Sequence, residues 1–201
     1  DGVRVIATGY GRVAVPYAHK VVTEITCHGT GAVRLFGDHG TVIDVGGQDT
    51  KVIQLKGGRV AKFAMNDKCA AGTGRFLEIM ADRLGISQQQ MADLARSGEP
   101  TKISSMCTVF AESEVVSLIA QNKAPDDIVH GLNKAVAAKT AALVQRVGGE
   151  EKYMMTGGVS KNQGLVQTLE EKLSAKLVIS ENAQLCGALG AALYAADMIA
   201  Q

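Results

Sequence analysis

The stretch that decides the fold reads Thr41-Val42-Ile43-Asp44-Val45-Gly46-Gly47-Gln48-Asp49-Thr50-Lys51. Its first five residues are mostly apolar and β-branched, which predicts a buried strand, and Gly46-Gly47 predicts a sharp turn directly after it. Residues 51–55 and 59–63 flank Gly57-Gly58 and predict a hairpin. A strand, a glycine turn and an antiparallel pair therefore follow one another.

Helices and strands alternate along the rest of the chain. We expect strands at residues 3–8, 152–155 and 177–179, and a helix over part of residues 21–35. Apolar spacing predicts further helices over residues 76–84, 109–120 and 187–200, and one that ends at Leu173. Ser87 is expected to cap a helix through Leu94, and Asp126 a long one to Val147. This alternation predicts an α/β fold.

Composition narrows the class of protein. The 201 residues, 46% apolar and 20% charged, suffice for one large domain or two small ones. A net charge of +1 and the absence of Trp argue against nucleic-acid binding. No apolar run approaches the roughly 20 residues of a membrane span, and no signal peptide opens the chain. We expect a cytoplasmic protein without a membrane partner, and an amino-terminal portion that precedes Asp1.

Two glycine turns are candidates for phosphate binding. Asp44 places a carboxylate at a strand end, where it can hold a metal-bound water, and the glycines after it let backbone amides approach phosphate oxygens. Gly157 and Gly158 repeat this pattern after a second strand, about 110 residues further on. An ordinary β-turn is the alternative for each. Two such turns together favour a nucleotide site.

Two of the four cysteines stand out by their surroundings. Cys69 and Cys107 are each expected where a helix begins, beside backbone amides that stabilise a thiolate. One chain supplies no second matched pair, so a four-thiolate metal site would form only across a two-fold axis. A buried free thiol is the alternative for both, and it is the preferred interpretation of Cys27 and Cys186.

Other polar residues receive no chemical role. Glu112 and Glu114 are candidate catalytic carboxylates, but a solvated or capping helix face is preferred. The histidines lack ligand spacing and are interpreted as surface or structural residues. They are His19, His28, His39 and His130.

These features occur together in a known family that the sequence resembles. The run Asn66-Asp67-Lys68-Cys69-Ala70-Ala71-Gly72-Thr73-Gly74-Arg75-Phe76 resembles the cluster-binding signature of activators of 2-hydroxyacyl-CoA dehydratases. The related ATPase subunits of benzoyl-CoA reductase share it. Further segments resemble the family in the same order. They are residues 8–12, 24–28, 44–49, 107–115, 156–162 and 187–194.

The resemblance implies a member of the acetate kinase, sugar kinase, heat-shock chaperone and actin superfamily, with two related α/β domains hinged around ATP. Residues 1–39 and 183–201 would belong to a first domain whose amino-terminal strands are missing here. Residues 40–182 would form a second domain, which carries the cysteines. The first phosphate loop of the family is not among these residues.

The resemblance also implies cofactors and roles. Cys69 and Cys107 would hold one [4Fe-4S] cluster across a homodimer, while Asp44 and Gln48 would position Mg²⁺ and the attacking water. The residues implied to contact ATP or ADP are Gly46, Gly47, Asp49, Gly157, Gly158, Val159, Asn162 and Gln184.

The function implied is that of an ATP-driven, low-potential electron donor of anaerobic metabolism. It would be reduced by ferredoxin or flavodoxin and would activate an acyl-CoA dehydratase. Three alternatives stay open at this point. They are an electron-transferring ATPase subunit of a benzoyl-CoA-type reductase, a small-molecule kinase of the same fold, and a structural zinc dimer.

Overall fold

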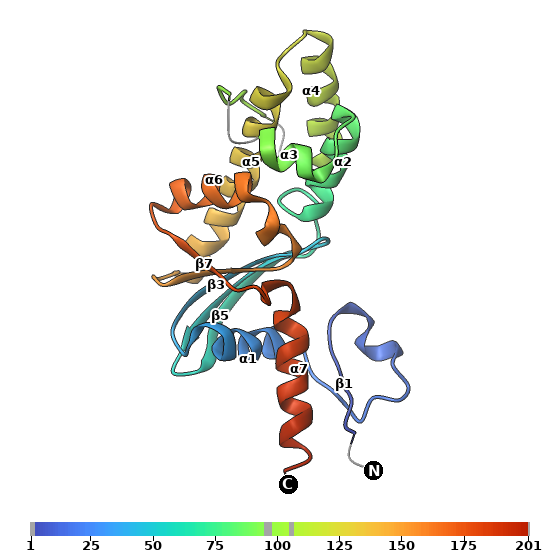
Figure 1. The fold of residues 1–201 in the computed structure, drawn as a ribbon, viewed down its shortest axis with the longest axis vertical. Coiled ribbons are helices and arrows are strands. Elements are labelled where there is room, and N and C mark those ends of the chain that lie inside the picture. Colours follow the sequence, from blue (N-terminus) through green and yellow to red (C-terminus); the bar gives the residue numbers. More distant parts are fainter. Residues whose placement is uncertain (1–2, 95–97, 105–106, 201) are drawn as a thin grey trace.

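The computed structural model describes residues 3–94, 98–104 and 107–200, and a mixed sheet lies at its centre (Figure 1). The strand order in this sheet is β5-β4-β3-β6-β7. β3 pairs antiparallel with β4 and parallel with β6, so the glycine turns after β3 and β6 meet at one edge. The strands are β3 (Gly40–Val45), β4 (Thr50–Lys56), β5 (Arg59–Asn66), β6 (Tyr153–Thr156) and β7 (Leu177–Ile179).

Helices cover both faces of the sheet (Figure 1). The long helix α5 and helix α6 lie on one face, whereas α1 and α7 lie on the other; α2, α3 and α4 form the end of the molecule opposite α7. The helices are α1 (Glu24–Phe36), α2 (Gly74–Leu84), α3 (Gln88–Leu94), α4 (Thr108–Ala120), α5 (Pro125–Val147), α6 (Gln163–Leu173) and α7 (Cys186–Asp197). Short 3-10 turns are η1 (Tyr10–Ala14), η2 (Gly158–Lys161) and η3 (Ala183–Leu185).

The alternation of side chains along the strands explains why β3 is buried throughout. Ile43 and Met155 point into the larger core, which they share with α2, α5 and α6. Their neighbours Val42 and Met154 point to the opposite face and pack with Ala32 of α1. Because both faces are covered, every residue of β3 is buried.

The α/β class and most elements predicted from the sequence are confirmed. The first strand is shorter than expected. Only Ile6–Ala7 (β1) pairs, because its partner β2 (Lys20–Val21) offers two residues. The predicted helix cap Asp126 is wrong. Ala124 is the N-cap, since Pro125 occupies the first helical position, where its fixed φ suits the helix. No described helix is both long and apolar enough to cross a membrane.

Cys69 does not begin a helix, which corrects a second expectation. It lies in the loop after β5, and α2 begins only at Gly74. Gly72 has a φ of +92°, and Thr73 is extended, so the chain takes helical geometry only after them. The placement of Cys107 is confirmed, because it is the N-cap of α4.

Helices α1 and α7 cross in close contact at two glycines. A Cβ atom at Gly190 would lie 1.7 Å from the carbonyl oxygen of Cys27, and one at Gly31 would lie 1.9 Å from that of Cys186. Only glycine permits this approach of the two backbones. The domain division predicted at residues 39/40 and 182/183 stays a prediction.

Replacement of Gly190 by alanine should force the crossing apart and lower the free energy of unfolding by about 1–3 kcal/mol. The matched control is Gly187→Ala in the same helix, where a Cβ would meet His28 Nδ1 at an ordinary 3.6 Å. Urea unfolding of both variants checks this. Equal stability of the two variants would show that the crossing does not depend on glycine.

Candidate nucleotide and thiol sites

The two glycine turns lie against each other at the end of the sheet. β3 leads into Gly46-Gly47, and its neighbour β6 leads into Gly157, which has a φ of +85°. A Cβ at Gly157 would lie 2.4 Å from the carbonyl oxygen of Val45. The parallel register that pairs Asp44 with Thr156 therefore brings the two turns together, as the sequence pattern indicates.

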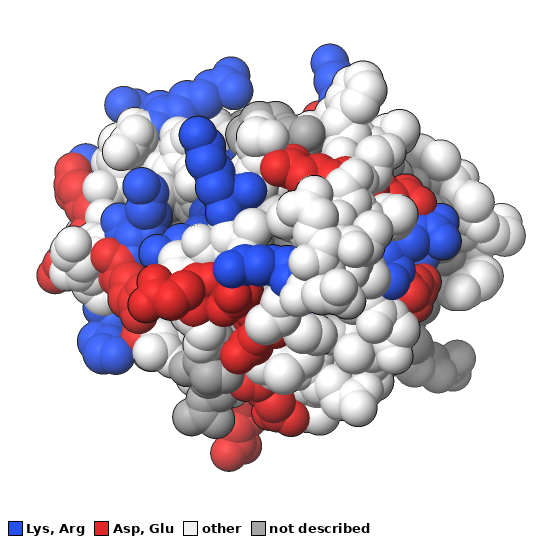
Figure 2. Space-filling view, turned by 90° about the horizontal axis from the view of Figure 1, so that it is seen from above, with Lys and Arg blue, Asp and Glu red and all other residues white. Residues whose placement is uncertain are grey.

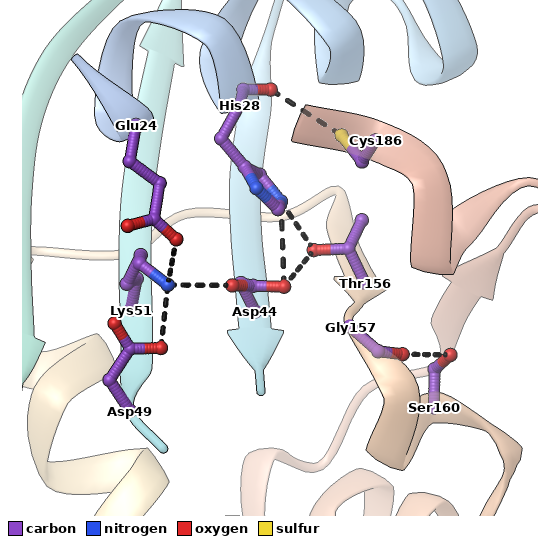
Figure 3. Close-up of polar contacts among 9 residues, drawn as sticks. All are labelled: Glu24, His28, Asp44, Asp49, Lys51, Thr156, Gly157, Ser160 and Cys186. Carbon is purple, nitrogen blue, oxygen red and sulfur yellow. Dashed lines mark hydrogen bonds and ion pairs between the residues drawn. The ribbon is translucent and has the colours of Figure 1, made fainter. Parts of the chain in front are cut away.

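A chain of side chains fixes Asp44 between the turns (Figure 3). The hydroxyl of Thr156 donates to Asp44 Oδ1 at 3.0 Å, and His28 Nε2 lies 2.8 Å from that hydroxyl. Since Thr156 donates its one proton to Asp44, its oxygen accepts from His28, which places the imidazole proton on Nε2. His28 Nε2 is also 3.5 Å from Asp44 Oδ1. The Asp44 carboxylate is thus buried, and side chains of α1 and β6 fix the orientation of its Oδ1.

A buried ammonium group holds the carboxylates of the site together (Figure 3). Lys51 is 1% exposed, and its Nζ contacts Glu24 Oε1 at 2.8 Å, Asp44 Oδ2 at 3.2 Å and Asp49 Oδ1 at 2.7 Å. Burial alone would lower the pKa of Lys51, but the carboxylates outweigh it and raise that pKa above its ordinary value. Three carboxylates around one ammonium leave excess negative charge.

Asp49 shows where a cation could enter. Burial raises the pKa of Asp49, against the opposing effect of its hydrogen bond from Lys51. Its second oxygen, Oδ2, is buried without a hydrogen-bond partner among the described residues. In the described part of the chain no three His, Cys, Asp or Glu side chains form a ready metal cage. Mg²⁺ commonly takes one or two carboxylates and completes its shell with phosphates and water, so the unpartnered Asp49 Oδ2 could serve as one of its ligands.

The other residues predicted to contact the nucleotide or to position the attacking water divide into three groups. Gly47, Gln48 and Gly158 lie exposed at the tips of the turns, and Gly46 closes the first turn by donating its amide to Asp49. Gln184 lies beside the second turn, since its Nε2 is 3.7 Å from the position of a Cβ at Gly158.

The last group consists of two residues with structural partners. Asn162 caps α6, because its side-chain oxygen accepts from the amide of Leu165. Val159 approaches the start of α2, since its Cγ2 is 3.0 Å from the position of a Cβ at Gly74.

Sequence reasoning missed part of this site. His28 was interpreted as surface or structural, and Glu24, Lys51 and Thr156 received no role. Glu24 and His28 are four residues apart on α1 and face the site together. Asp49 and Lys51 are two residues apart where β4 begins, a spacing that places side chains on one face of a strand. These spacings were the available signal.

A cavity of about 440 Å³ opens beside the carboxylates. Glu24 and Lys51 line it on one side, and Tyr10, Arg12 and Asp67 are among its other lining residues. It lies between the amino-terminal segment, α1 and the end of β5. A polar ligand that enters this cavity meets the charged centre of the site directly.

The turn that follows β3 is bonded to the segment that carries Cys69. The amide of Gly74 donates to the carbonyl of Gly46 at 2.8 Å, and the amide of Arg75 donates to that of Gly47 at 2.8 Å. The Thr50 hydroxyl adds a bond to the carbonyl of Gly72 at 2.6 Å. The two features singled out from the sequence thus form one structural unit.

The four cysteines separate by accessibility as expected. Cys69 is half-buried and Cys107 is exposed, whereas Cys27 and Cys186 are fully buried. Burial raises the pKa of Cys27 despite a hydrogen bond with Thr8, and burial together with the Asp44 charge raises the pKa of Cys186 to about 12. The two buried thiols are therefore unreactive.

The two glutamates have structural partners, and their assignment to a solvated or capping face stays a prediction. Glu112 is paired with Arg83 of α2, and Glu114 accepts hydrogen bonds from Ser104. Of the histidines, three make hydrogen bonds at the surface, and only His28 belongs to the site. The three are His19, His39 and His130.

Helix α4 carries an apolar stripe on its outer face. Ala111 and Val115 are buried, whereas Val109, Phe110 and Val116 are 66%, 68% and 51% exposed. Cys107 caps the same helix. Figure 2, which looks onto the end of the molecule formed by α2 to α4, shows a broad uncharged area beside clusters of both signs. These three side chains form an exposed apolar patch beside Cys107.

Comparison with known proteins identifies the class. The chain belongs to the BadF/BadG/BcrA/BcrD ATPase family, whose profile matches residues 1–195. It has the α/β actin-like ATPase fold of solved dehydratase components, as predicted. A solved ethanolamine utilization protein EutJ from Carboxydothermus hydrogenoformans, 14% identical with a TM-score of 0.60, shares the fold alone.

Particular relatives are dehydratase activators. The (R)-2-hydroxyglutaryl-CoA dehydratase activating ATPase of Acidaminococcus fermentans is 47% identical over 94% of this chain and 74% of its own length. The crystal structure of component A of that dehydratase gives a TM-score of 0.93, covering 98% of this chain and 76% of that one.

The 2-hydroxyisocaproyl-CoA dehydratase activator of Clostridioides difficile is 42% identical over 96% of this chain and 74% of its own length. Its structure with bound ADPNP also gives a TM-score of 0.93, covering 98% of this chain and 74% of that one.

Removing the buried ammonium tests its role in the site. Lys51→Met should lower the free energy of unfolding by about 3–5 kcal/mol, because it leaves buried carboxylates uncompensated. Since the pKa of Lys51 is raised from 10.5, this loss should be full below pH 10.5 and fade only as the pH rises further.

The control is Lys56→Met on the same strand, where an exposed lysine pairs with Glu150. Its effect should stay within about 0.5 kcal/mol. Urea unfolding at several pH values measures both variants. A Lys51→Met protein as stable as Lys56→Met would contradict the charge balance.

Proposed function

We propose that this protein is an ATP-dependent, low-potential electron donor that activates a 2-hydroxyacyl-CoA dehydratase through a [4Fe-4S] cluster shared across a homodimer. The observation that carries the proposal is the direct bonding between the Gly46-Gly47 turn and the Cys69 segment. A change at the turn on nucleotide binding is transmitted by hydrogen bonds to a thiol loop. The names of the relatives, as dehydratase activators, support the same function.

Mg-ATP would bind at the two glycine turns. Gly47 and Gln48 lie at the exposed tip of the first turn, where backbone amides can approach a phosphate. Asp44 is oriented by Thr156 and Lys51 to bind a metal-bound water, and Gln48 would orient the water that attacks. Bound Mg²⁺ would neutralise phosphate charge. The relative solved with ADPNP supports this assignment.

Asp44→Asn should slow phosphate release from ATP by about 100-fold or more, because the amide is neutral and positions a metal-bound water poorly. The exposed residue Asp38, replaced by Asn, serves as the matched control and should hydrolyse ATP at the rate of the unchanged protein. Iron content, measured in parallel, should be the same in all three proteins. Loss of iron in Asp44→Asn would indicate that the turn only maintains the thiol loop.

Cys69 and Cys107 would hold the cluster. Both are free and reach the surface, and each lies close to where a helix begins. Two thiols per chain match half of a four-thiolate site, so the donor set fits a cluster shared by two copies. When bound, such a cluster accepts and releases one electron. Ferredoxin or flavodoxin would supply that electron, and the dehydratase would receive it.

The dimer is supported by the apolar stripe of α4. Val109, Phe110 and Val116 begin beside Cys107 and leave the helix uncovered on that side. A second copy packed there would bury the stripe and bring two Cys107 side chains towards one axis.

Anaerobic reconstitution with iron and sulfide tests the thiol assignment. Cys69→Ser and Cys107→Ser should each lose the iron of the dimer, because a serine oxygen is a poor ligand for this cluster. Cys27→Ala, which removes a buried thiol, should retain it. Iron analysis, visible absorption and sedimentation are the measurements.

Other outcomes favour the alternative functions. Unchanged iron per dimer in Cys69→Ser would show that the ligand assignment is wrong. A colourless dimer that retains zinc would indicate a structural metal site, and phosphoryl transfer to a sugar or acid without iron would indicate a kinase. A benzoyl-CoA reductase polypeptide of Thauera aromatica is 32% identical over 86% of this chain, so its reductase is the second acceptor to assay.

A further inference from the structure

A lysine ammonium lies against the sulfur of Cys69. Lys139 extends from α5, and its Nζ is 3.7 Å from Cys69 Sγ. The aliphatic stem of Lys139 crosses the loop at Gly72, where its Cδ is 3.1 Å from the position that a Cβ would occupy. A side chain at position 72 would therefore require this stem to shift by a few tenths of an ångström. The contact joins the long helix on one face of the sheet to the thiol loop.

Hydrogen bonds hold the loop in this relation to α5. Asn66 Nδ2 donates to the carbonyls of Cys69 at 2.8 Å and Ala71 at 3.0 Å. Thr73 Oγ1 donates to the carbonyl of Ala70 at 2.6 Å. The loop is thus bonded at successive carbonyls, so the sulfur is positioned before any ligand arrives.

The charge of Lys139 is not neutralised at close range. A cavity of about 330 Å³ adjoins it, and the described residues that line this cavity include Arg146 but no Asp or Glu. Among the described residues, no carboxylate forms an ion pair with Lys139. The positive charge of Lys139 therefore acts on the sulfur without a carboxylate to neutralise it. Because Lys139 is half-buried, water screens this charge only in part.

The surroundings of Cys107 differ. Its side chain is exposed, and among the described residues no ammonium or guanidinium group forms a hydrogen bond with its sulfur. Among the described residues, the side-chain cation that contacts a surface thiol is Lys139, at Cys69.

We propose that Lys139 is a positioning residue that raises the reduction potential of a metal centre held by Cys69. This inference rests on the proposed function, because it takes Cys69 as a ligand. Adding one electron, with no bond or proton transferred, makes the charge next to Lys139 one unit more negative. A fixed cation stabilises that reduced state more than the oxidised one.

The test is a redox titration of the reconstituted homodimer with dithionite as reductant and EPR as readout. Lys139→Met should give a more negative midpoint. At the solution potential where half of the unchanged protein is reduced, the ratio of reduced to oxidised centre should fall by about tenfold. Lys139→Arg, which keeps the charge, should restore the ratio to within about twofold.

The matched control is Lys134→Met, which removes an exposed lysine from the same helix, beside a different cavity. Its midpoint should equal that of the unchanged protein. Iron per dimer and the urea unfolding of the iron-free proteins are measured alongside, because a merely structural role would alter these and leave the midpoint in place.

The remaining outcomes distinguish a failure of the tuning role of Lys139 from a failure of the proposed function. An unchanged midpoint in a fully loaded Lys139→Met protein would overturn the tuning role. If Lys139→Met and Lys139→Gln both fail to take up iron while the iron-free proteins stay stable, Lys139 acts in assembly, and the tuning role is again overturned. If the unchanged protein itself takes up no iron, the proposed function fails, which is a distinct result.

Discussion

Two backbone hydrogen bonds join the parts of this protein that carry different chemistry. The amides of Gly74 and Arg75 donate to the carbonyls of Gly46 and Gly47, so the start of α2 is attached to the turn that follows β3. Both bonds join backbone to backbone, so no flexible side chain lies between the two segments. A shift of the turn therefore displaces the start of α2, and with it the loop that ends there. The proposed coupling of nucleotide to thiol depends on this short link.

The ion pairs of Lys51 hold together the segments around the same turn. Lys51 is surrounded by Glu24, Asp44 and Asp49, which come from α1, the end of β3 and the start of β4. An ion cluster of this kind contributes little net stability by itself, but the loss of one member leaves buried charge uncompensated. The excess negative charge and the unpartnered oxygen of Asp49 suit a site that takes up a cation with its nucleotide.

The sequence predicted the fold well where local pattern decides the structure. The buried strand, the hairpin and the glycine turns follow from β-branched runs and Gly pairs, and the α/β class follows from their alternation. The errors lie where a competing local preference prevails. Pro125 displaced the cap expected at Asp126, and the conformations of Gly72 and Thr73 delayed α2 past Cys69.

The site was predictable only in part. Asp44 and the glycines are predictable from their position after a strand, and Lys51 lies close in sequence to Asp44 and Asp49. His28 and Lys139, in contrast, acquire a role from neighbours distant in sequence. His28 meets Thr156 across 128 positions, and Lys139 meets Cys69 across 70. No pattern within one segment indicates such contacts. The resemblance of the motifs indicated the thiols, and the tertiary structure was needed to find the cations that accompany them.

Amide hydrogen exchange of the segment 68–77 tests the central coupling most directly, with and without Mg-ADPNP at an occupancy verified by calorimetry. The bonds from Gly74 and Arg75 to the turn predict a changed exchange rate in this segment on nucleotide binding, while the distant hairpin at Gly57-Gly58 exchanges as before. Identical exchange of residues 68–77 in the free and nucleotide-bound protein would contradict the account.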